Sequence, residues 1–424
     1  MPKKKKNEKG FLVLLDFFKQ LSLIKRIVIG IILGGLLGIF LPQWSFIAIF
    51  GSLFVGALKA VAPLLVFVLI MASISKHQST TQTYIKPIIS LYLFTTLLAA
   101  TIAVLASYLF PLTISLQEVS GSQEAPKALI DVLTTILNNI VQNPLQAMIE
   151  GNYLGVLFWS ALIGFALRTR KNSVKEVIDE FSLAITGVVQ LIIAMAPLGI
   201  AGLVFESVSS TGLAGLMQYG RLLLLLVGTM LIVDLVVYPL VAFVLIRQNP
   251  YPLVWFCLKE SAIPAFFTRS SAANIPINMM LAKRIGLTKE SYSISLPLGA
   301  TINMGGAAIT ISIMTLTAVH TLGIDVPFSL TLILCVLSAL SACGASGIAG
   351  GSLLLIPLAC SLFGISNDIA MQVVGVGFII GVVQDSVETA VNSSNDLFFT
   401  AIGEFYDLRK RGEKINLKER LANK

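Results

Sequence analysis

The sequence predicts an all-α polytopic membrane protein with eight transmembrane helices and two opposed re-entrant helical hairpins. Three observations lead to this fold class. Hydrophobic residues make up 56% of the 424 residues and charged residues only 12%, about half the charged fraction of a soluble domain. Several apolar runs are long enough to cross a bilayer. Basic residues cluster between these runs, as they do in cytoplasmic loops.

Most of the net charge lies in two short tails. Residues 1–10 contain five Lys and one Glu, and residues 404–424 contain seven Lys or Arg and four acidic residues, which together give +7 of the net charge of +8. The rest of the chain has too few charges to cover a water-facing surface. The basic balance therefore reflects the tails, and no nucleic-acid partner is expected.

Eight apolar stretches are predicted to span the membrane. The clearest is 222–246, which is flanked by Arg221 and Arg247. With both termini in the cytoplasm, this count places the basic residues of 76–86 and 168–175 on the cytoplasmic side, as the positive-inside rule requires. The spans are expected near 24–42, 47–75, 88–112, 128–167, 181–208, 222–246, 290–322 and 369–400.

Two further apolar stretches, 253–284 and 327–364, are interrupted at their centres. The interruptions read TRSSAANIP at 268–276 and ACGASGIAGGS at 342–352. Irregular backbone at membrane depth survives only where it is buried in protein or lines a wet cavity. Reading either stretch as a full span would push a basic cluster outside, so both are predicted to be re-entrant hairpins from opposite faces. Such a pair suggests inverted repeats, whose broken helices form the binding site in secondary transporters.

The last predicted span carries three acidic residues on one helical face. Asp385, Glu388 and Asp396 recur with Thr389 and Asn392 at intervals of three or four residues, which places them on the same side of a helix. Ionisable residues inside a membrane mark ion or substrate pathways by default. The alternative is a satisfied polar network without a transport role, but three acids in a span without a basic residue need cations from elsewhere.

Two sources of positive charge are available. Arg269 is the only basic residue at the centre of either hairpin, and its partner could be Asp385 or Glu388. The other source is a bound alkali cation, a hard ion that takes oxygen ligands. The segment GATINMGG at 299–306 offers backbone carbonyls, since its glycines disfavour a regular helix. The third span adds hydroxyls that share one face, although such groups usually only pack between helices: Tyr92, Thr95 and Thr96.

Four motifs in this order resemble the sodium:dicarboxylate and amino-acid symporter family, which includes glutamate carriers. They are RSSAANIP at 269–276, GATI followed by NMGGA at 299–307, the glycine-rich second tip, and the DxxxTxxNxxxD pattern from Asp385 to Asp396. The resemblance covers nearly the whole chain. It implies an elevator-type carrier, a homotrimer in the inner membrane of a bacterium, whose mobile transport part moves against a scaffold.

The resemblance also implies a division of the chain. It comprises a cytoplasmic basic tail (1–23), scaffold spans 1 and 2 (24–84), span 3 of the transport part (85–112), scaffold spans 4 and 5 (113–220), a transport core (221–403) and a cytoplasmic tail (404–424). The transport core holds spans 6, 7 and 8 and both hairpins.

Individual residues receive roles from the same resemblance. Asp385 would bind the ammonium group of an amino acid, and Thr389 would lie beside its side chain. The substrate site would comprise Arg269, Ser271, Ile348, Ser352, Asp385, Glu388, Thr389 and Asn392. Three sodium sites would use, in turn, Gly299, Asn303, Asn392 and Asp396; then Thr301, Ala342, Cys343 and Ala345; then Tyr92, Thr95, Thr96 and Asn303.

Two departures from the family pattern bear on substrate and coupling. Glutamate and aspartate carriers have an Arg where this chain has Glu388, which would repel an acidic substrate. The sequence therefore predicts sodium-coupled import of small neutral amino acids, serine and threonine above all. The alternative is a sodium- or proton-coupled carrier for acidic amino acids or dicarboxylates. The family also has an Asp where this chain has Gly305. That Asp helps to form the third sodium site, so the sequence does not decide whether this site, and thus a third sodium ion, is present.

Two other functional classes fit the sequence less well. An intramembrane serine hydrolase would use Ser346 of the GASG sequence, but a serine nucleophile needs a base within hydrogen-bond reach. His320 is predicted at the outer end of span 7, far from such a position. An ion channel would need repeated pore-lining rings, whereas this chain has one asymmetric site. The sequence thus predicts a carrier rather than an enzyme.

Overall fold

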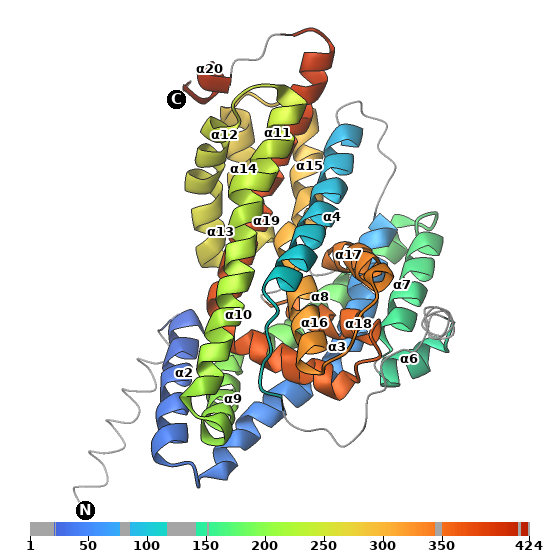
Figure 1. Cartoon of the computed structure of the whole chain (residues 1–424). Helices are drawn as coiled ribbons and strands as arrows, with labels where there is room; N and C mark the ends of the chain where they lie inside the picture. The colour runs from blue at the N-terminus through green and yellow to red at the C-terminus, as the bar shows by residue number, and fades with distance from the viewer. Residues whose placement is uncertain are drawn as a thin grey trace, which may run out of the picture.

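The computed structural model describes residues 21, 23–76, 85–116, 141–150, 152–343, 350–413 and 417–422, and these residues form helices and no strand. Six helical segments among them are long and apolar enough to cross a bilayer. The all-helical fold class is therefore confirmed. The helices surround the long helix α19 (Asn367–Lys410), which runs through the middle of the bundle (Figure 1).

The N-terminal half of the chain supplies the helices α2 (Leu23–Phe40), α3 (Ala48–Lys76), α6 (Pro144–Glu150), α7 (Tyr153–Leu167), α8 (Asn172–Ala194) and α9 (Ala196–Thr211). The expected fifth span, 181–208, is divided into two helices. α8 ends at Ala194, and α9 begins two residues later with Pro197 in its first turn. Proline fits a first turn, where its missing N–H has no partner to lose. The first part of the expected span 128–167 lies outside the described residues.

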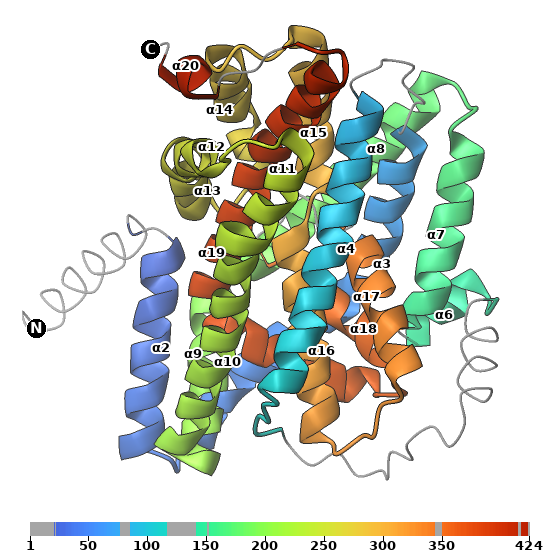
Figure 2. The same ribbon diagram turned by 45° about the horizontal axis from the view of Figure 1, so that its top comes forward.

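Glycines in α2 allow its backbone to contact the backbone of α9 directly, and the two helices lie side by side in Figure 2. A Cβ atom at Gly30 would lie 2.3 Å from the carbonyl oxygen of Pro197, and one at Gly34 would lie 2.3 Å from that of Ala201. Small residues at such spacing are the usual means of close helix packing in membranes. This contact fixes α9 against the first helix.

The helix after α9 is interrupted once by a wider turn. α10 (Leu213–Ile232) passes through a π-helical turn, Val233–Val237, into α11 (Tyr238–Ile246). Asp234 lies in that turn and is buried. α4 (Ile85–Leu109) crosses the same part of the bundle (Figure 2).

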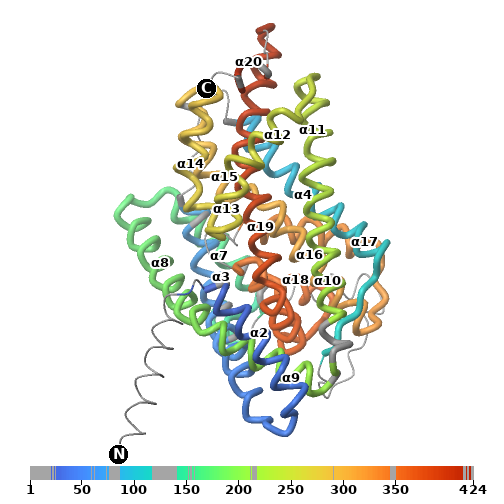
Figure 3. The backbone as a smooth tube through the Cα atoms, turned by 90° about the vertical axis from the view of Figure 1, so that its left-hand side faces the viewer, coloured from blue at the N-terminus to red at the C-terminus, as the bar shows by residue number. Residues whose placement is uncertain are grey.

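The first predicted hairpin forms a helix–turn–helix unit beside α19 (Figure 3). One arm consists of α12 (Tyr251–Cys257), the π-helical turn Leu258–Ala262 and α13 (Ile263–Thr268), and the other is α14 (Ser271–Arg284). At the tip, Arg269 adopts a left-handed conformation with φ of 52°, and the Ser270 hydroxyl accepts a hydrogen bond from the Ala273 amide at 3.2 Å. The turn reverses the chain at Arg269 and the Ser270 cap begins α14.

The second predicted hairpin is described in its arms. α17 (Phe328–Ala342) forms the first arm, and a 3₁₀ turn, Leu353–Leu355, leads into α18 (Ile356–Ser361) in the second. Residues 344–349 of the tip lie outside the described residues, and with them Ala345, Ser346 and Ile348.

The predicted break in span 7 is confirmed. α15 (Lys289–Ile302) and α16 (Gly305–Thr321) are separated by Asn303 and Met304, which leave the helical conformation. The residues of α16 from Gly305 to Val319 are buried. This helix is therefore shielded by protein along most of its length, and its polar side chains face other parts of the chain.

α19 extends beyond the expected end of span 8. It continues to Lys410, and the buried Glu404 accepts hydrogen bonds from the amide and hydroxyl of Thr288 at 3.0 Å each, at the start of α15. Arg420 of α20 (Leu417–Ala422) donates to the carbonyl of Gly286 at 2.9 Å. The segment predicted as a tail from residue 404 is therefore packed against the core as far as it is described.

We expect Gly34→Ala to destabilise the protein by about 1–3 kcal/mol, because the added methyl group collides with the α9 backbone, which cannot move aside easily. Thermal unfolding in detergent measures the effect. Gly35→Ala is the matched control, since its Cβ meets nothing nearer than Val204 Cγ1 at 3.9 Å. Equal melting temperatures for the two variants would contradict this account of the α2–α9 contact.

Candidate functional site

The candidate site lies on the polar face of α19, where both hairpins and the break in span 7 meet. Asp385, Glu388, Asn392 and Asp396 are all buried there. Together these side chains contact both hairpins, α16 and the break in span 7. The site is therefore assembled from segments far apart in the sequence.

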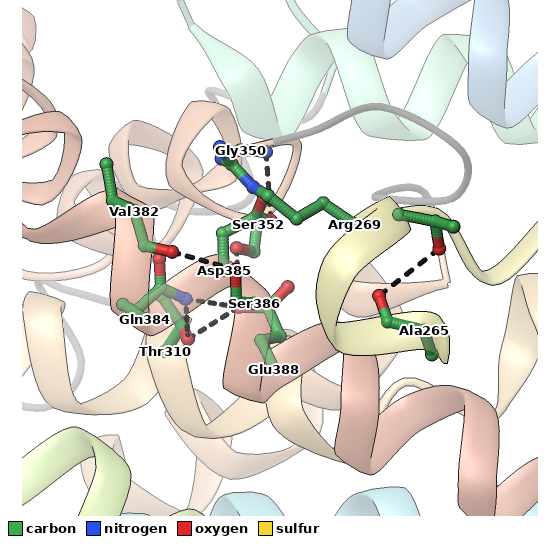
Figure 4. Close-up of polar contacts among 11 residues, drawn as sticks. Ala265, Arg269, Thr310, Gly350, Ser352, Val382, Gln384, Asp385, Ser386 and Glu388 are labelled. Carbon is green, nitrogen blue, oxygen red and sulfur yellow. Dashed lines mark hydrogen bonds and ion pairs between the residues drawn. The ribbon is translucent and has the colours of Figure 1, made fainter. Parts of the chain in front are cut away.

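Asp385 joins the two hairpins, as Figure 4 shows. Its Oδ2 accepts from Arg269 Nε at 2.6 Å, and its Oδ1 accepts from the Gly350 amide at 3.0 Å. The left-handed turn at Arg269 directs the guanidinium from the first tip toward α19. Of the two partners that the sequence left open for Arg269, the structure shows Asp385 and not Glu388.

Glu388 is held by neutral donors. Its Oε2 accepts from Thr310 Oγ1 at 2.7 Å, from Ser352 Oγ at 2.8 Å and from Gln384 Nε2 (Figure 4). No ion pair to Glu388 is present among the described residues. A buried carboxylate with hydrogen bonds but no counter-charge is costly, so this position favours a nearby cation or a bound proton.

Asn392 fixes the start of α16 against α19. Its Oδ1 accepts from the Gly306 amide at 2.7 Å. A Cβ atom at Gly306 would lie 3.0 Å from the carbonyl oxygen of Glu388, so glycine permits this close approach. Ser271, the first residue of α14, and Thr389 are also buried, each with 6% of its surface exposed.

Asp396 lies beside the break in span 7. Its Oδ1 accepts from Asn303 Nδ2 at 3.0 Å, and the amide oxygen of Asn303 is buried with no hydrogen-bond partner among the described residues. A Cβ atom at Gly299 would lie 2.8 Å from the same Oδ1. Within the described part of the chain, Asp396 has no basic partner and lies next to an unpaired amide oxygen, and oxygen donors of this kind are the ones that a hard cation prefers.

The other predicted sodium ligands surround the same break. The carbonyl oxygen of Ile302 lies 3.7 Å from Cys343 Sγ and 3.5 Å from Thr96 Oγ1. Ile302 directly follows Thr301, so the second hairpin approaches the predicted second site. Ala342 is buried next to Cys343. Thr95 Oγ1 instead donates to its own helix, to the Leu91 carbonyl at 2.7 Å.

Tyr92 reaches α19 directly. Its hydroxyl lies 2.7 Å from Thr400 Oγ1 and donates to the Asp396 carbonyl at 3.0 Å. Of the ligands predicted for the third sodium site, Tyr92 and Asn303 lie beside Asp396, whereas the Thr95 hydroxyl donates to a carbonyl of its own helix.

Sequence reasoning missed Tyr238, which occupies the space above Gly305. A Cβ atom at Gly305 would lie 2.0 Å from the Tyr238 hydroxyl oxygen. The aspartate that the family pattern has at this position therefore does not fit beside Tyr238. The third predicted sodium site therefore has no carboxylate at position 305, and the Tyr238 hydroxyl leaves no room for one.

Two more groups of contacts were not predicted. Thr310 and Gln384 complete the Glu388 cluster, and Gln384 lies one helical turn before Glu388, which is the spacing of neighbours on a helix. The first hairpin is joined to α19 by an amide–hydroxyl network, in which Asn274 Nδ2 donates to Ser393 Oγ at 2.9 Å and Asn278 Nδ2 donates to the Ser393 carbonyl at 2.9 Å. Asn274 Nδ2 also donates to Ser261 Oγ at 3.0 Å.

Known proteins match the chain over nearly its whole length. The sequence matches the sodium:dicarboxylate symporter family over residues 23–404. It is 65% identical to the serine/threonine transporter SstT of Enterococcus faecalis over 400 residues, which are 94% of this chain and 95% of that protein. It is 56% identical to the SstT of Lacticaseibacillus paracasei over 405 residues (95% and 93%) and 55% identical to that of Streptococcus agalactiae over 391 residues (92% and 97%). The family resemblance of the motifs is thereby confirmed, and this chain belongs to the sodium:dicarboxylate symporter family.

Proposed function

We propose that this protein is a sodium-coupled symporter that imports serine and threonine across the cytoplasmic membrane of a bacterium. The observation that carries the proposal is the acidic pair at the centre of the site. Asp385 can exchange the guanidinium of Arg269 for a substrate ammonium, and among the described residues Glu388 accepts hydrogen bonds only from neutral donors. The names of the relatives, which are transporters and not enzymes, support the same substrates.

An amino acid can replace the ion pair between Asp385 and Arg269. Its ammonium group takes the place of the guanidinium on Asp385, and its carboxylate lies near the freed Arg269, the Asn392 amide and the backbone of Ser271. The exchange keeps each buried charge paired, which avoids the cost of an isolated ion. Ile348 remains a proposed contact from the second tip.

Glu388 gives the site its preference for a hydroxyl group. Ser352 of the second hairpin donates to Glu388 in this structure. The hydroxyl of serine or threonine can take over this donor position, beside Thr389 and Thr310. An acidic side chain would instead bring a second carboxylate to Glu388, which costs several kcal/mol in an interior of low dielectric. The alternative of a carrier for acidic amino acids or dicarboxylates is therefore disfavoured.

Sodium is proposed as the coupled substrate. The first site comprises Asp396, the free amide oxygen of Asn303, and carbonyls of Gly299 and Asn392. The second uses carbonyls near Thr301 and the second hairpin from Ala342 to Ala345, including Cys343. The third uses Tyr92, Thr95, Thr96 and Asn303 without a carboxylate of its own, so we propose that it binds sodium more weakly.

The mechanical part of the proposal follows the predicted division of the chain. A transport core of residues 221–403 with span 3 (85–112) moves against a scaffold of 24–84 and 113–220. We propose eight spans, two re-entrant hairpins, cytoplasmic termini and a homotrimer. The wide apolar surface of α8, with Val177 and Leu191 about 70% exposed, supports contacts of the scaffold with lipid or with a second copy.

The function is tested by uptake of labelled amino acids into proteoliposomes. We expect an inward sodium gradient to drive accumulation of serine and threonine but not of aspartate. Counterflow, in which internal unlabelled serine drives entry of labelled serine, separates a carrier from a channel. Serine uptake that ignores the sodium gradient, or uptake of aspartate in its place, would refute the proposal.

Asp396→Asn should abolish sodium-driven serine uptake, because it removes the only carboxylate of the first proposed sodium site at nearly constant side-chain size. Uptake measured against sodium concentration gives the result. Glu404→Gln is a control, since Glu404 is a buried acid of the same helix that contacts Thr288 instead of the site. A folded Asp396→Asn protein with ordinary sodium dependence would remove Asp396 from the coupling site.

Glu388→Gln should weaken discrimination against aspartate, and Glu388→Arg should reduce serine uptake at least tenfold, which corresponds to about 1.4 kcal/mol. The glutamine variant keeps the size and the hydrogen bonds of the site but removes the repelling charge. Competition of unlabelled aspartate against labelled serine measures the change. If both variants fold and still transport serine while ignoring aspartate, Glu388 does not set selectivity.

A further inference from the structure

We propose that Asp234 is a proton-binding site that tunes sodium binding through its contact with Asn395. The inference rests on the proposed sodium-coupled function and concerns a carboxylate that this function does not otherwise use. Asp234 is 5% exposed and lies in the π-helical turn Val233–Val237 between α10 and α11. π-Helical turns inside α-helices occur frequently at functional sites.

The contact of Asp234 with α19 is short and directional. Asp234 Oδ1 accepts from Asn395 Nδ2 at 2.6 Å, and the same nitrogen donates to the Val391 carbonyl at 2.7 Å. Two acceptors therefore fix the orientation of the Asn395 amide. Asn395 directly precedes Asp396, the carboxylate of the first proposed sodium site, so the state of Asp234 acts on the turn of α19 that holds that ligand.

A small cavity lies next to this contact. Its volume is about 10 Å³, which is close to the least space that one water molecule requires. One wall includes Leu258, the first residue of the other π-helical turn, Leu258–Ala262. The lining residues are Asp234, Val254, Cys257, Leu258, Ser394, Asn395 and Phe398.

This cavity suits a proton rather than a metal ion. A hard cation takes six or more oxygen ligands, whereas most of the lining is apolar and the amide of Asn395 turns its nitrogen, not its oxygen, toward Asp234. A proton needs only a carboxylate oxygen, and the cavity is about large enough for one water molecule that could exchange it.

Among the described residues, Asp234 has no basic partner that would keep it ionised. No ion pair to Asp234 is present in the described part of the chain. The titratable groups near it include the Cys257 thiol of α12, the Tyr238 phenol at the start of α11 and, beyond Asn395, the Asp396 carboxylate. The Tyr251 phenol of α12 donates to the carbonyl of Leu235, the next residue of the turn. The other helices packed on α10 carry Lys86, Tyr92 and Tyr108 (α4), Glu206 (α9) and His320 (α16).

The coupling to sodium follows from charge. When Asp234 is ionised, its bond with Asn395 is charge-assisted and stronger, and its negative charge favours a cation near Asp396. When Asp234 binds a proton, both effects are lost. Because linkage is reciprocal, a proton on Asp234 weakens sodium binding and sodium binding releases that proton.

The test measures sodium binding to the purified protein in detergent, without substrate, at several pH values. Proton release is followed with an indicator dye and sodium affinity by intrinsic fluorescence. In the wild type we expect the half-saturating sodium concentration to rise as the pH falls, and protons to be released when sodium is added. In Asp234→Asn we expect a smaller rise and fewer protons released, while sodium still binds.

Asn395→Ala provides a second variant in case Asp234→Asn does not fold. It leaves the carboxylate in place but removes its link to α19, so the pH dependence of sodium affinity should also shrink. Glu404→Gln is the matched control and should behave as the wild type. Wild-type pH dependence in both Asp234→Asn and Asn395→Ala would overturn the inference. A wild-type protein that binds no sodium would instead overturn the proposed function.

Discussion

Acidic side chains buried on one central helix are the constraint on which the rest of this structure depends. Asp385, Glu388 and Asp396 lie on α19 at depths where neither water nor lipid can satisfy them. An ion in such a place costs several kcal/mol unless donors or cations reach it. The two hairpins and the broken span 7 provide those donors, because their turns bring side chains and free backbone groups to the middle of the bundle. The irregular backbone at the centre of the bundle and the buried acids therefore explain each other.

Close approach of backbones makes this arrangement possible. The amide of Gly306 reaches Asn392 only because no side chain intervenes, and Gly299 leaves room for the carboxylate of Asp396. Glycine destabilises a helix relative to alanine, so close packing and not helix propensity explains the glycines at these positions. The same principle holds α2 against α9 at Gly34, which lies outside the candidate site.

The features that the sequence predicts correctly are those set by local composition. Apolar runs located most of the helices, and the glycines around 299–306 predicted the break at Asn303. Which residues meet across the bundle depends on packing between distant segments, which a single sequence does not record. The partner of Arg269 could be narrowed only to two acids, and the donors to Glu388 were not found. The π-helical turn at Asp234 and the Tyr238 hydroxyl near Gly305 had no local signal, whereas Pro197 is a local signal for the division of the fifth span that the prediction did not use.

The two hairpins are attached to α19 by partly different contacts, and this difference bears on the proposed transport function. The first is held by a network of neutral amides and hydroxyls, through Asn274, Asn278 and Ser393, and by the ion pair of Arg269 with Asp385. The second contacts the site through the Gly350 amide and the Ser352 hydroxyl, which bind Asp385 and Glu388. In the proposed function, an amino acid that takes over these two carboxylates competes with the second hairpin and with Arg269 of the first, and leaves only the amide network of the first hairpin intact. If the proposed substrate site is correct, substrate binding and the position of the second hairpin are linked by the same two acids.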